Sequence, residues 1–108
     1  MTKQDVHETI KAKAAEYGFI AEESNWGING LVIREDGEST VNFLITEHCD
    51  GDWENRKVNI TLQVRASIAT MGGNPSADEL LKAADTIRRA AQLVKALDDE
   101  NLTYQETF

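Results

Sequence analysis

The residues best suited to chemistry lie together in one stretch, ITEHCDGDWENRKV, from Ile45 to Val58. It holds the only cysteine of the chain, Cys49, next to one of the two histidines, His48, with four carboxylates and a tryptophan. A nucleophilic thiol needs a base within hydrogen-bonding distance, but neighbours in an extended chain point to opposite faces. The stretch gives no support to a Cys–His pair, and we expect no catalytic residues.

Metal binding has equally little support in this stretch. Zinc sites usually need four ligands from spaced Cys or His pairs, and the chain has a single cysteine. Asp50, Asp52 and Glu54 alternate as at the start of an EF-hand loop. However, Asn55 stands sixth, where glycine is needed, and Thr61 stands twelfth, where glutamate is needed. A weak surface cation site stays open as an alternative to the expected solvated acidic loop, which needs no cofactor.

Two helices are expected to help position this loop. The first runs from Thr2 to Tyr17, with a capping box at its start and Gly18 as its stop. The second begins at the cap residue Ser76 and ends near Leu97. Its predicted buried stripe consists of Leu80, Ala84, Ile87, Ala91 and Val94, widened by Leu81 and Leu97.

Three strands are expected between these helices. They cover about residues 28–34, 39–46 and 57–68, and an Asp-Gly turn at 35–38 joins the first two. The third alternates apolar and polar residues over a dozen positions, which predicts one buried and one solvated face. The order favours a two-layer α+β domain, a helix–three-stranded antiparallel meander–helix fold (αβββα). It would span residues 1–108 as a single domain, with 102–108 as a C-terminal tail.

The charge balance limits the partners that the chain can bind. The chain has 19 acidic residues against 11 Lys and Arg, a formal net charge of −8. This argues against direct nucleic-acid binding and against anionic membranes, and it suits a basic protein partner. The single cysteine and the absence of a signal-peptide pattern favour a cytoplasmic location.

The meander gathers much of this acidity at one end of the expected fold. The turn between the second and third strands, the entry to the first strand and the end of the last helix would all lie there. The predicted partner-binding residues at this acidic end are Glu22, Glu23, Glu47, Asp50, Asp52, Trp53, Glu54, Asp98, Asp99 and Glu100. Trp53 could be an interface anchor or could pack on the domain's own helix end. Like charges crowded at a helix C-terminus oppose stability, so their concentration suits docking onto a basic groove.

The expected architecture and the acidic turns of LVIREDGESTVNFLITE (Leu31–Glu47) resemble several small phage anti-CRISPR proteins, which block guide-RNA nucleases as DNA mimics. The chain is also similar in style to acidic immunity proteins that neutralise nuclease toxins. The resemblance lies in architecture and carries over no functional residue. It implies a non-enzymatic inhibitor or adaptor that docks on a basic nucleic-acid-handling protein, such as a CRISPR nuclease. The alternative is a homo-oligomeric accessory protein of phage or mobile-element origin, possible as a homodimer, that binds through its sheet face or edge.

Overall fold

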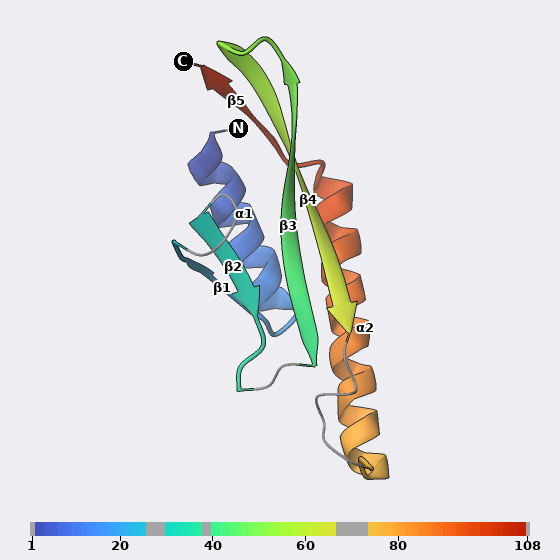
Figure 1. The fold of residues 1–108 in the computed structure, drawn as a ribbon. Coiled ribbons are helices and arrows are strands. Elements are labelled where there is room, and N and C mark those ends of the chain that lie inside the picture. Colours follow the sequence, from blue (N-terminus) through green and yellow to red (C-terminus); the bar gives the residue numbers. More distant parts are fainter. Residues whose placement is uncertain (1, 26–29, 38–39, 67–73, 108) are drawn as a thin grey trace.

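The computed structural model places two helices behind a layer of antiparallel strands (Figure 1). It describes residues 2–25, 30–37, 40–66 and 74–107. The molecule is elongated, with principal extents of 53 × 22 × 20 Å. The β3–β4 hairpin and the first turns of α2 extend past opposite ends of the core, which accounts for this length (Figure 1).

Helix α1 (Lys3–Glu16) begins and ends as its sequence predicts. Thr2 and Asp5 form the expected capping box, and the buried face consists of Val6, His7, Ile10 and Ala14. Gly18 follows the helix with φ +81°, a conformation that glycine adopts without steric cost. Phe19 then turns back, its N–H donating to the carbonyl of Ala14 at 2.9 Å, and its ring is buried.

The first strand pair is a short antiparallel hairpin in which β1 (Ile20–Glu23) pairs with β2 (Leu31–Arg34). The sequence predicts β2 in part, but residues 21–27 were expected to be a connection, and this is wrong for the part that lies in β1. Positions 28 and 29 of the expected strand lie outside the described residues. Strand β2 lies beside β3 without forming a ladder with it. The expected Asp-Gly turn therefore joins two sheets. The side chain of Glu35, only 9% exposed, accepts a hydrogen bond from the Val41 N–H at 2.6 Å there.

The second sheet has the order β3-β4-β5, with β4 (Asn55–Ala66) between β3 (Val41–Gly51) and β5 (Thr103–Thr107). The predicted alternation in the central strand is confirmed. Val58, Ile60 and Leu62 are buried, whereas Thr61 and Gln63 are exposed on the other face. The helices therefore cover one face only. Of the expected strand ends, positions 39, 67 and 68 lie outside the described residues.

The expected C-terminal tail at 102–108 is wrong over most of its length. Leu102 is buried, and Thr103–Thr107 form β5, which pairs with β4 from Asn55 to Asn59. Apolar Leu102 and Tyr104 alternate with polar Thr103 and Gln105, which is the period-two signal of a strand with one buried face. The alternation covers too few residues to distinguish a strand from an irregular end by sequence alone.

Helix α2 (Ala77–Glu100) has the expected capping box between Ser76 and Glu79 but presents a different face to the core. The predicted stripe is wrong by one position for several residues, because the buried residues are Ala83, Thr86, Ala90, Leu93 and Leu97. Leu80 is 43% exposed. The first turns of the helix extend beyond the sheet, where no layer covers them (Figure 1).

Arg89 fastens α2 to the end of α1. Its Nη1 donates to the Tyr17 carbonyl at 2.7 Å, and its guanidinium lies 5.1 Å from the ring centroid of Phe19. Asp85 accepts from Arg89 at 3.0 Å, which is the i,i+4 pair expected for this helix face. Taken together, the α+β class is confirmed, and β1 and β5 are added to the three expected strands.

Candidate functional site

The most prominent feature of the molecule is the end of the β3–β4 hairpin, residues Asp50–Glu54, which we call the hairpin tip (Figure 1). The ladder continues as far as the pair Gly51 and Arg56. Gly51 has φ +103°, and a Cβ there would lie 3.0 Å from the Asn55 carbonyl oxygen. The turn is closed by the Asn55 N–H, which donates to the Asp52 carbonyl at 3.3 Å. Only glycine fits this position without strain, which explains how the sequence forms so tight a tip.

The three carboxylates of the tip differ in their surroundings. Asp50 lies on the outer sheet face, where its oxygens are 3.1 Å from His48 Nε2 and 3.1 Å from Asn59 Nδ2. Asp52 and Glu54 are exposed, and neither forms an ion pair with any residue that the structure describes. These two acids therefore present free negative charge to a partner.

Trp53 is 82% exposed at the end of the tip, so the alternative in which it packs on the domain's own helix is wrong. The Arg56 guanidinium lies 5.7 Å from its ring centroid. Arg56 also donates to Glu106 of β5 at 2.9 Å, and this hydrogen bond raises the pKa of the guanidinium. A permanent cation thus holds the base of the tip and faces the indole ring. Glu106 was missed in the sequence because β5 was not recognised.

The two acids expected at the strand entry, Glu22 and Glu23, lie apart from the tip on β1 and have cationic partners. Glu22 accepts from Arg34 at 2.8 Å. Glu23 lies 3.4 Å from Lys11 Nζ and 3.9 Å from His7 Nδ1. Their charge is balanced locally, so they add little to the field at the tip.

The acids that end α2 also lie apart from the tip. Asp98, Asp99 and Glu100 form the last helical residues, and Glu100 is 3.7 Å from Lys13 Nζ. Leu102, just after them, accepts from the Ile60 N–H on the central strand. From Ile60 to the tip is six residues, or about 20 Å of strand. That is roughly two Debye lengths at physiological salt, so the two groups act as separate patches.

Glu47 lies near the acids at the end of α2 rather than at the hairpin tip. It pairs with Ile60 across the ladder, level with the end of α2. Burial of the Tyr104 phenol raises its pKa to about 12. The negative charges of Glu47 and Glu106 contribute to the same increase. The structure therefore divides the predicted acidic end into the tip, the α2 end with Glu47, and the paired acids of β1.

The geometry provides no catalytic pair at the tip. Cys49 is opposite Val58 and His48 is opposite Asn59, so the two side chains point to opposite faces of the sheet. Cys49 is free and exposed. In the part of the chain that the structure describes, no three His, Cys, Asp or Glu side chains are placed to hold a metal ion, and Asp50, Asp52 and Glu54 are within that part. Neither described helix is long and apolar enough to cross a membrane.

The chain was compared with protein-family models, curated proteins and solved structures. No family model, no curated protein and no solved structure matches the chain. The functional argument therefore depends on the placement of the residues themselves.

Proposed function

We propose that this protein is a non-enzymatic inhibitor or adaptor that docks its hairpin tip into a basic groove of a nucleic-acid-handling protein. The observation that carries the proposal is the placement of Trp53. It is 82% exposed at the far end of a protruding hairpin, between Asp52 and Glu54, two acids that form no ion pair with a described residue. Exposed tryptophan is uncommon outside interfaces, and tryptophan is among the residues that most often dominate binding energy.

The charges around Trp53 favour a cationic partner. The tip and the neighbouring ends of β4 and β5 carry the acids Asp50, Asp52, Glu54 and Glu106 against the bases Arg56 and Lys57. A protruding patch of negative charge speeds association with a positive groove and repels nucleic acid itself. Carboxylates on such a hairpin would occupy a groove that otherwise holds phosphates.

The resemblance to phage anti-CRISPR proteins inferred from the sequence adds one class of partner to the same proposal. The chain would then be a stoichiometric DNA mimic that docks on a CRISPR nuclease. A cytoplasmic location belongs to the proposal because such nucleases act there.

A competition experiment tests the proposal. Guide-loaded CRISPR nucleases and other basic nucleic-acid-binding proteins would be titrated with the chain in the presence of labelled DNA. We expect the chain to displace DNA from at least one of them in a one-to-one, saturable manner, with weaker displacement as salt rises. A ternary complex, in which DNA and this protein bind one partner together without competing, would contradict mimicry.

A second candidate function is self-association through the outer face of the β3-β4-β5 sheet. One observation favours it: Leu44 is 42% exposed on that face, among Thr46, Thr61 and Gln63. A dimer formed there would make the chain a homo-oligomeric accessory protein. Sedimentation across protein concentrations tests this, because an apolar interface persists at high salt whereas docking by the tip weakens. A Leu44→Lys variant would abolish such a dimer.

A further inference from the structure

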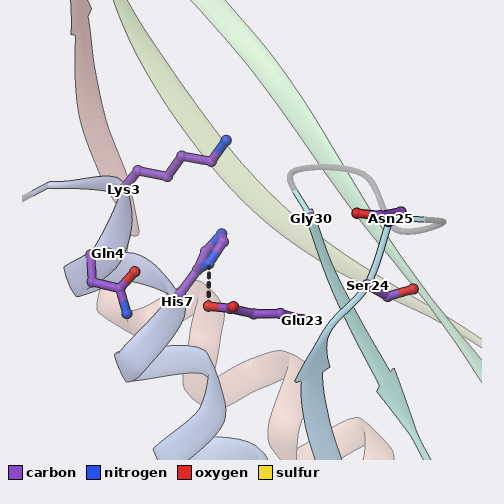
Figure 2. A pocket seen from close by; sticks show the side chains of 7 residues that line it. All are labelled: Lys3, Gln4, His7, Glu23, Ser24, Asn25 and Gly30. Carbon is purple, nitrogen blue, oxygen red and sulfur yellow. Dashed lines mark ion pairs between the residues drawn. The ribbon is translucent and has the colours of Figure 1, made fainter.

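A cavity of about 840 Å³ lies between the first turns of α1 and the end of the β1–β2 hairpin, away from the hairpin tip (Figure 2). Its volume is in the range of small-molecule sites. The side chains that line it are polar: Lys3, Gln4, His7, Glu23, Ser24 and Asn25. A hollow with this lining favours a polar ligand over an apolar one.

His7 is the unusual member of this lining. It is 7% exposed, and Figure 2 shows its ring directed from α1 into the cavity, between Lys3 and Glu23. Its Nε2 is buried and has no hydrogen-bond partner among the residues that the structure describes. Buried polar atoms in proteins nearly always have a partner, so an orphaned nitrogen in the wall of a cavity indicates a site for a ligand atom.

The neighbours of His7 define what that ligand atom must be. Nδ1 lies 3.9 Å from the Glu23 carboxylate, so in the uncharged ring the proton is favoured on Nδ1, the nitrogen that faces this carboxylate. Nε2 then carries a lone pair and accepts a hydrogen bond. The matching ligand group is therefore a hydrogen-bond donor, such as an ammonium group.

Lys3 lies one helical turn before His7 on the same α1 wall of the cavity, and it supplies the complementary preference (Figure 2). Among the residues that the structure describes, its ammonium forms no ion pair, although the chain carries 19 acids. It is the first residue of α1, where the helix dipole also favours negative charge. Asp5 in the same turn is already occupied by the capping box with Thr2. The open cation at the cavity therefore suits a carboxylate.

We propose that this cavity binds a free α-amino acid, with its ammonium group donating to His7 Nε2 and its carboxylate held by Lys3. The site uses none of the residues of the hairpin tip, so it stands independently of the proposed docking function. It gives the chain a second binding activity, for a zwitterion rather than for a protein.

Titration of the full, ¹⁵N-labelled chain with a panel of free amino acids tests this site by NMR. We expect a saturable change in the His7 imidazole nitrogen signals, with His48, exposed and distant on β3, as the internal control. Acetate and methylamine, which carry one half of the zwitterion each, should bind roughly tenfold more weakly, since each loses about one charged hydrogen bond.

Two variants test whether His7 and Lys3 bind the amino acid directly. His7→Phe keeps the ring volume and removes the acceptor, and Lys3→Gln removes the surface cation without touching the core. Each should weaken amino-acid binding by roughly tenfold or more, whereas the matched His48→Phe should leave it unchanged. The proposal is overturned if no amino acid shifts His7, if acetate shifts it equally well, or if Lys3→Gln binds as the parent chain does.

Discussion

Arg56 and Glu106 are 50 positions apart in sequence and join at the base of the hairpin tip, with a distance of 2.8 Å between Arg56 Nη2 and a carboxylate oxygen of Glu106. The contact fastens β5 to β4 where the hairpin leaves the core. The Glu106 carboxylate also balances the positive charge of Arg56, which stays protonated. Asp52 and Glu54, a few residues away, are left without a cationic partner among the described residues. The same interaction thus braces the tip and preserves its negative charge.

The buried phenol of Tyr104 predicts a loss of stability at high pH. Burial raises its pKa to about 12 from the ordinary phenol value of 10.0, and nearby acids add to the increase. Below about pH 10 both the folded and the unfolded chain hold the proton. Above that pH the unfolded chain loses it first. The free energy of unfolding should therefore fall by about 2–3 kcal/mol between about pH 10 and about pH 12.

Denaturant unfolding at a series of pH values measures this effect, and Tyr104→Phe is the control. Because lysines also titrate in this range, the informative quantity is the difference between the two proteins. We expect the parent chain to lose stability more steeply than Tyr104→Phe does. Identical slopes would show that the phenol is not responsible.

Gly18→Ala should destabilise the fold more than the matched change Gly37→Ala. Both glycines have positive φ, at +81° and +78°, so each substitution costs about 1–2 kcal/mol from the backbone alone. A Cβ at Gly18 would also lie 2.7 Å from Arg89 Nη1, whereas a Cβ at Gly37 would meet nothing within 4 Å. Chemical denaturation measures both variants. Equal losses would mean that Arg89 moves aside without cost.

Cys49→Ser should leave the protein nearly unchanged. The thiol is free and exposed, and the His48 side chain points to the opposite face of the sheet. Exposed substitutions of this kind usually change the free energy of unfolding by less than about 0.5 kcal/mol. Denaturation curves and metal analysis of the purified chain check this. A stoichiometric metal that disappears with the substitution would refute our account of this stretch.

Several parts of the fold could be predicted from local sequence patterns because local chemistry decides them. The capping boxes at Thr2 and Ser76 and the alternation in β4 depend only on neighbouring residues, and all three are confirmed. Strand β5 and the buried face of α2 depend on what packs against them. Two helical stripes of similar apolarity exist on α2, and only the tertiary fold selects the one through Ala90 and Leu93.

The candidate site was predictable to a similar extent. The exposed acids around Trp53 follow from a polar loop between two strands. Their separation from Asp98–Glu100 was missed because the register of β4 with β5 sets how far the hairpin extends beyond α2. The orphaned nitrogen of His7 could not be predicted either. His7 lies on the same helix face as Val6 and Ile10. The apolar spacing of those two residues indicates that this face is buried, but it does not show whether the His7 nitrogen has a partner.

Trp53→Ala should affect binding and leave folding intact. The ring is 82% exposed, so the free energy of unfolding should change by less than about 0.5 kcal/mol. If the ring is an anchor, its loss speeds dissociation from a partner and leaves the association rate nearly constant. Surface plasmon resonance separates the two rates. A variant that associates slowly but dissociates at the normal rate would show that Trp53 is not an interface anchor.

The most direct measurement of the central claim is the association rate of a charge-reversed tip. Asp52→Lys with Glu54→Lys is cleaner than any pair including Asp50, whose oxygens contact His48 and Asn59. The matched control is Glu16→Lys with Asp36→Lys, two exposed acids on α1 and after β2.

Both double variants have the same net charge, so only the place of the change differs. With a nuclease that the parent chain inhibits, we predict that the tip variant associates at least tenfold more slowly at low salt, that the loss shrinks as salt rises, and that the control stays close to the parent chain. Equal association rates for the tip variant and the control would contradict docking by the hairpin tip.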